Sequence, residues 1–152
     1  MRKSKSTPSV PLPPGFHWTL VLILEIVTLG LFGCVWAIVQ ALWAKKFDPS
    51  SKALSLYIVA TVVMVAGEIL ELMHADITIQ AAVQIGSALI ATFGAFSVKN
   101  SLARYITSVE GSPTYLSGLM TIVLGEVYLQ YHMNRVRAFQ SRRRERDLAP
   151  AQ

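Results

Sequence analysis

The chain has 152 residues, of which 53% are hydrophobic and only 15% are charged, and its formal net charge is +5. Soluble domains usually carry about 25% charged residues, and a small globule has too little interior to hide long apolar runs. The composition therefore argues against a soluble enzyme and favours an integral membrane protein. Because backbone polar groups must be satisfied within lipid, we expect an all-α fold.

Residues 1–15 are polar and rich in proline, and we interpret them as a tether without a core of its own. The apolar run 18–44 follows, long enough at 1.5 Å per residue to cross a bilayer as one tilted helix. We expect this run to be retained, since no small-residue cleavage pattern follows it. An alternative is a re-entrant segment that folds back at Gly30–Gly33.

Three further hydrophobic segments are predicted at 53–73, 79–98 and 115–132. Asp48 and Pro49 favour a chain reversal before the second segment. Between the third and fourth segments, apolar residues at helical spacing predict a short helix in the membrane interface. The sequence thus predicts a four-helix transmembrane domain over 16–134, followed by a basic tail over 135–152.

The positive charges give an orientation for this four-span arrangement. The N-terminus, the 74–78 connection and the tail carry nine Lys and Arg residues, against five on the opposite side. Positive residues favour the cytoplasmic side. We therefore predict a multi-pass protein of the bacterial cytoplasmic membrane with both termini in the cytoplasm.

The basic tail predicts contact with anionic lipid headgroups, which attract Lys and Arg near the membrane surface. The candidate headgroup contacts are Arg142, Arg143 and Arg144. Nucleic acid is not expected as a partner, because positive flanks are the ordinary pattern of membrane segments.

Each predicted helix carries its polar residues on one face, as expected for a bundle with a polar interior. Acidic side chains at membrane depth are costly, so they are candidates for function. The hypothetical intramembrane polar site comprises Glu25, Glu68, Glu71, Glu126, Gln84 and Gln130. One interpretation is structural, with hydrogen-bonded glutamates holding the helices in register. The other is a proton or cation site at the cytoplasmic end of a pathway, where the carboxylates form one layer.

Glu71 and His74 are spaced to share a helical face, as in the Glu-x-x-His pairs of di-iron bundles. No second such pair occurs in the sequence, so we expect no metal site and no cofactor. Phosphate-binding glycine loops, Cys-x-x-Cys pairs and zinc-binding His-Glu-x-x-His helices are also missing. The sequence therefore gives no indication of an enzyme, although a membrane metalloenzyme stays as a distant alternative.

The stretch from Ile26 to Gly33, followed by Trp36 and the pair Lys45 and Lys46, resembles the start of a bacterial family of small multi-span membrane proteins. The stretch from Tyr128 to Asn134 resembles its closing segment, which precedes a basic tail. That family is known only as a domain of unknown function. The resemblance implies a bacterial origin and residence in a membrane, and it implies no activity.

The function that the sequence favours is a non-enzymatic structural or accessory membrane component. Its expected partners are the lipid bilayer and, as possibilities, a second copy of itself or another membrane protein. The alternative is a small channel or a proton- or cation-coupled transporter that uses the intramembrane glutamates.

Overall fold

The computed structural model describes residues 12–28 and 30–148, with the backbone alone from residue 143 onward. Within these residues every regular element is an α-helix and no strand occurs, so the all-α prediction is confirmed there. The helices are α1 (Trp18–Val27), α2 (Leu31–Phe47), α3 (Ala53–Leu72), α4 (Ile77–Glu110) and α5 (Gly118–Leu148).

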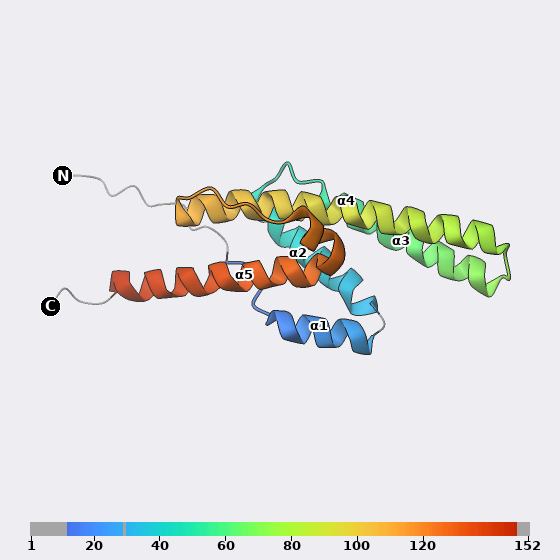
Figure 1. Ribbon diagram of the computed structural model, residues 1–152, viewed down its shortest axis with the longest axis horizontal. Helices are drawn as coiled ribbons and strands as arrows, with labels where there is room; N and C mark the ends of the chain where they lie inside the picture. The colour runs from blue at the N-terminus through green and yellow to red at the C-terminus, as the bar shows by residue number, and fades with distance from the viewer. Residues whose placement is uncertain (1–11, 29, 149–152) are drawn as a thin grey trace.

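The first apolar run forms two helices, which differs from the single helix predicted over 18–44. The Thr28 hydroxyl donates to the carbonyl oxygen of Leu24 and accepts from the backbone N–H of Phe32, so it bonds both helices at the break. Gly30 then adopts a left-handed conformation with φ of 89°, which a residue without Cβ tolerates. As a result α2 turns back from the end of α1 (Figure 1), and this reversal is the part of the re-entrant alternative that the structure shows.

Helices α3 and α4 form a long hairpin whose tip extends beyond the other helices (Figure 1). At the tip, the Asp76 carboxylate caps α4 by accepting a 2.7 Å hydrogen bond from the backbone N–H of Thr78, which lowers the pKa of Asp76. Small residues allow the two helices to pack closely, since a Cβ added at Gly67 would lie 3.3 Å from Val83 and one added at Gly94 would lie 3.1 Å from Tyr57. The Ser87 hydroxyl also donates to the Ala60 carbonyl oxygen at 3.0 Å.

Two boundaries differ from the prediction in this half of the chain. The third segment does not end near residue 98, because α4 continues without a break to Glu110 and ends at Gly111, whose φ is 75°. The short interfacial helix predicted beyond residue 98 is therefore the last part of α4. Likewise α5 runs on through the predicted tail to Leu148, with a kink at Gly125, whose φ of 43° is not helical.

Only α3 and α4, among the described helices, are long and apolar enough to cross a membrane. Large apolar side chains on both helices are exposed, including Val62 and Leu72 on α3 and Ile85 and Phe93 on α4, each more than 60% exposed. Contiguous exposed apolar surface of this kind indicates contact with lipid or another protein. These two helices support a membrane location, but the predicted bundle of four spanning helices is not confirmed.

The main core lies where α2, α4 and α5 meet. Tyr105 of α4 is fully buried there, and the rings of Trp43 and Phe47 pack edge-on against it at centroid distances of 4.9 and 5.0 Å. Leu102, Leu129 and Met133 are also fully buried in this cluster. The last part of α4 is thus packed on both α2 and α5 and serves as a base for the hairpin.

A buried aspartate ties the connection between α2 and α3 to α4. The Asp48 carboxylate accepts hydrogen bonds from the hydroxyls of Ser50 and Ser101, at 2.6 and 2.8 Å, and pairs with Arg104. The Ser50 hydrogen bond contributes most to lowering the pKa of Asp48, and burial opposes it. The Asp48–Pro49 turn predicted from sequence therefore also carries an ion pair to α4.

Candidate functional site

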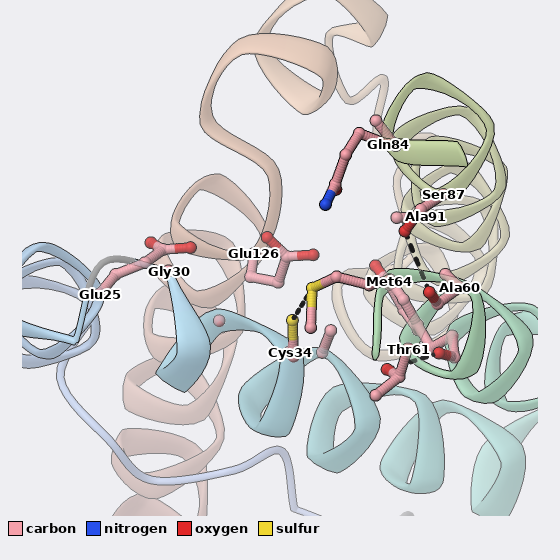
Figure 2. Close-up of a pocket in the computed structure, with 14 residues that line it drawn as sticks. Glu25, Gly30, Cys34, Ala60, Thr61, Met64, Gln84, Ser87, Ala91 and Glu126 are labelled. Carbon is pink, nitrogen blue, oxygen red and sulfur yellow. Dashed lines mark hydrogen bonds between the residues drawn. The ribbon is translucent and has the colours of Figure 1, made fainter. Parts of the chain in front are cut away.

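All five helices contribute to one partly open cavity of about 260 Å³. Helices α1 and α5 each provide a single lining residue, Glu25 and Glu126, while α2, α3 and α4 provide mostly small or apolar side chains. The remaining lining residues are Gly30, Gly33, Cys34, Ala37, Tyr57, Ala60, Thr61, Met64, Gln84, Ser87, Ala88 and Ala91. Figure 2 shows the Glu126 and Gln84 side chains pointing into this space.

The two glutamates reach the cavity because of nearby glycines. The Glu25 carboxyl lies over Gly33, where an added Cβ would come within 2.5 Å of its Oε1 atom. Glu126 directly follows the non-helical Gly125. No lysine or arginine lines the cavity, and neither carboxyl belongs to an ion pair among the residues that the structure describes. The cavity therefore contains two acidic groups without a basic partner.

Tyr57 adds a buried hydroxyl to the same cavity. Its side chain is 3% exposed, and its ring packs against Gly94, where a Cβ would lie 3.1 Å from the ring. The hydroxyl faces the Glu126 carboxyl, yet it makes no hydrogen bond of standard geometry. Most buried polar groups have such a partner, so this hydroxyl is an unsatisfied group in the lining.

The predicted layer of four glutamates is only half realised. Glu25 and Glu126 line the cavity, but Glu68 and Glu71 are exposed on α3 and lie outside it. Gln84 connects the two regions, since it lines the cavity and its amide donates to the Glu68 carboxyl at 3.3 Å. Because α3 extends past α1 and α5 (Figure 1), its last turns have no acidic neighbour from those helices.

Gln130 has a different role from the one predicted, because it lies outside the cavity lining in a buried hydrogen-bond network. Its side-chain oxygen accepts from Trp36 Nε1 at 3.1 Å and from Gln40 Nε2 at 3.3 Å. Its side-chain nitrogen donates to the carbonyl oxygens of Pro14 and Phe16, at 3.1 and 2.7 Å. Gln130 thus fastens the segment before α1 to α2 and α5.

The proposed metal ligands Glu71 and His74 are both exposed near the tip of the α3–α4 hairpin. Within residues 12–28 and 30–148 no group of three or more His, Cys, Asp or Glu side chains is placed to hold a metal ion. Nothing in the described structure therefore supports the Glu71–His74 pair as a metal site.

Of the three candidate lipid contacts, Arg142 is exposed on α5, and its contact with headgroups stays a prediction. It lines a second cavity with Arg135, Phe139 and Glu110, at the junction of α5 with the end of α4. The side chains of Arg143 and Arg144 lie outside the described residues, so their contact with headgroups stays a prediction.

Three further residues of the cavity lining were not among the predicted site residues. Cys34 of α2 lines the cavity, and its Sγ lies 3.7 Å from the sulfur of Met64 on α3. Tyr57 and Met64 of α3 line it together with Thr61. The spacing of these α3 residues, four and then three positions apart, indicates a common helical face, whereas no comparable pattern singles out Cys34.

Comparisons with known proteins give no relative for this chain. No protein-family model, no curated protein and no solved structure matches it.

Proposed function

We propose that this protein is a non-enzymatic membrane component that crosses the bilayer twice, through α3 and α4. The single observation that carries the proposal is the position of the positive charges relative to these helices. The chain has 14 Lys and Arg residues, and none occurs between Lys52 and Lys99, the interval that contains α3, the hairpin tip and the first part of α4. If α3 and α4 are the two spans, every Lys and Arg residue falls on the same side of the membrane.

The helix lengths favour two spans over the predicted four. At 1.5 Å per residue, the ten residues of α1 measure about 15 Å, roughly half of a bilayer core. Helix α2 turns back from α1 and ends with Lys45 and Lys46, so together they form a hairpin that enters and leaves on one side. Helix α3, with 20 residues and about 30 Å, matches the core.

The same reasoning applies to the C-terminal half. Helix α4 is about 51 Å long from its 34 residues, so its last part projects beyond the bilayer core. In this arrangement that part packs with α5 on the positive side, which is the cytoplasm by the positive-inside rule. Only the first turns of α5, with the exposed Leu119, Ile122 and Val123, dip into the membrane.

This arrangement gives the protein its proposed role in the bacterial cytoplasmic membrane. The α3–α4 hairpin anchors the chain, and a cytoplasmic base of α4 and α5 lies against anionic headgroups through the arginines of α5. The apolar sides of the hairpin contact lipid, a second copy or another membrane protein. An accessory or oligomer-forming component fits these surfaces, and both termini remain cytoplasmic in this proposal.

Single-cysteine labelling distinguishes two spans from four. In a Cys34→Ala background, we would introduce one cysteine at Lys46, Ala75 or Ser112 and treat intact cells with a membrane-impermeant maleimide. Two spans predict labelling at position 75 alone, with 46 and 112 reacting only after permeabilisation. Four spans predict that positions 46 and 112 react in intact cells and that position 75 reacts only after permeabilisation. That result would overturn the proposal.

A further inference from the structure

We propose that the five-helix cavity is a binding site for a small organic cation, with one ammonium group on a short apolar body. The site is defined by Glu25 and Glu126 on the acidic side and by the α2–α4 lining on the other. It deepens the proposed function by assigning a ligand to a membrane component, and it requires the α1–α2 hairpin to lie at membrane depth as proposed there.

Charge is the first argument for a cation. Glu25 and Glu126 interact electrostatically and line one cavity that no Lys or Arg enters. Burying an ionised carboxylate without a partner is costly, and acidic groups at membrane depth mark ion or substrate sites. A cation placed between the two carboxylates would relieve their repulsion and stabilise the ionised form of both.

The Tyr57 hydroxyl is the second argument. It is buried in the cavity wall, faces the Glu126 carboxyl, and makes no hydrogen bond of standard geometry. An ammonium N–H group would donate to this oxygen while it pairs with the neighbouring Glu126 carboxylate. The geometry thus offers a hydroxyl acceptor beside the negative charge.

The rest of the lining indicates an organic rather than an inorganic ion. The lining also contains Ala37, Ala60, Ala88 and Ala91, together with the thioether of Met64. A divalent ion would require six to eight oxygen ligands for Ca²⁺ or an octahedral shell for Mg²⁺. Besides the glutamates and Tyr57, the oxygen-bearing side chains of the lining are engaged elsewhere: the Thr61 and Ser87 hydroxyls donate to the carbonyl oxygens of Tyr57 and Ala60, and the Gln84 amide donates to Glu68. Among the described residues no group of three or more His, Cys, Asp or Glu side chains is placed to hold a metal ion. The small apolar side chains of the lining suit a short alkyl chain. The volume of about 260 Å³ lies below the range of drug-sized sites, which restricts the ligand to a small amine.

The test uses n-butylammonium chloride as the probe and n-butanol as the uncharged control of similar length. The full-length protein, purified in a neutral detergent, would be titrated at constant ionic strength while its thermal unfolding is followed. Ligand that binds the folded state raises the unfolding temperature in a saturable way. We expect saturation with n-butylammonium and none with n-butanol or sodium chloride.

Variants assign the response to the cavity. We expect Glu126→Gln or Glu25→Gln to raise the apparent Kd for n-butylammonium by about tenfold or more. Glu71→Gln makes the same charge change on the exposed part of α3 and should leave the Kd within about twofold. If a glutamate variant fails to fold, Ala91→Leu fills the cavity instead, with exposed Ala82→Leu as its control, and is expected to abolish binding.

Several results would overturn the inference. An equal response to n-butanol would show a merely apolar cavity, and an equal response to sodium would show an inorganic site. The absence of saturable binding, loss of binding in Glu71→Gln, or full binding in Ala91→Leu would each refute it. These outcomes are separate from the labelling result, because two spans can be correct while the cavity binds no amine.

Discussion

Replacement of Gln130 by leucine tests whether the buried amide network holds the segment before α1 in place. The Gln130 side chain is fully buried, and leucine can neither donate nor accept a hydrogen bond. The change leaves the buried Trp36 Nε1 group and the carbonyl oxygens of Pro14 and Phe16 without this partner. An unsatisfied buried polar group costs about 1–3 kcal/mol. Counting the indole and one carbonyl, we expect a loss of about 2–6 kcal/mol in the free energy of unfolding.

The matched control is Gln80→Leu, the same substitution near the hairpin tip. Gln80 is half-buried and its amide donates to the Ala75 carbonyl oxygen at 2.8 Å. Loss of one such hydrogen bond costs about 0.5–1.5 kcal/mol. Both variants would be unfolded by titration with sodium dodecyl sulfate in mixed micelles, and tryptophan fluorescence would report the transition. Equal losses in the two variants would refute the reasoning, because the network would then add nothing to a single hydrogen bond.

Two further predictions concern the hairpin and its base. Gly94→Leu forces a side chain into the Tyr57 ring and should lower the free energy of unfolding by about 1–3 kcal/mol. Gly86→Leu is the control, because its Cβ position is open, and it should lower stability much less. Thermal unfolding of each purified variant compares the two. Asp48→Asn should destabilise the protein at pH 7 by about 1.5–3 kcal/mol, since Arg104 loses its charged partner. Because the folded-state pKa of Asp48 is lowered, its contribution is complete above the unfolded pKa of about 3.9 and is lost as the pH falls through the folded value. Unfolding of both proteins from pH 7 to pH 3 should therefore show their difference shrinking below about pH 4, and a constant difference would contradict the role of the carboxylate.

The helical class and the rough position of each apolar segment were predictable, because hydropathy and segment length are local properties of the sequence. The break inside the first segment was harder to predict. The largely apolar run 18–44 is compatible with one tilted helix or with two short ones, and the deciding feature is the conformation at Thr28 and Gly30. Both residues occur within ordinary membrane helices, so their presence alone does not predict a reversal.

The candidate site was predictable in part for a related reason. Helical spacing indicates which residues share a face, and Tyr57, Thr61 and Met64, which are four and then three positions apart, all line the cavity from α3. It does not predict where along that face a neighbouring helix begins. Glu25 and Glu126 line the same cavity because of the turn after α1 and the kink before Glu126, which fix their positions along the neighbouring α3. Glu68 lies farther along α3, outside this cavity.

Gln130 shows how tertiary contacts change the meaning of a polar residue. On a helical wheel it shares a face with Glu126, one turn earlier, and both were assigned to one site. In the structure the Gln130 amide reaches the backbone of Pro14 and Phe16, residues more than 110 positions away in sequence. An amide both donates and accepts, so it can satisfy several backbone groups, whereas a carboxylate only accepts. This difference suits the Gln130 amide to joining several backbone segments, a role that a carboxylate at the same position could not fill.

The charge pattern connects the helix boundaries to the proposed topology. Counted over four spans, the same positive residues divide nine to five, a modest asymmetry. Because α2 turns back from α1, the lysines before α3 lie in the half of the molecule that contains α5 (Figure 1). Because α4 continues to Glu110, the basic residues near its end lie in the same half. The hairpin tip holds only His74, Asp76 and nearby glutamates as ionisable groups. In the proposed topology, a membrane across α3 would separate the described lysines and arginines from the acidic tip, and the cavity with Glu25 and Glu126 would fall between these two ends.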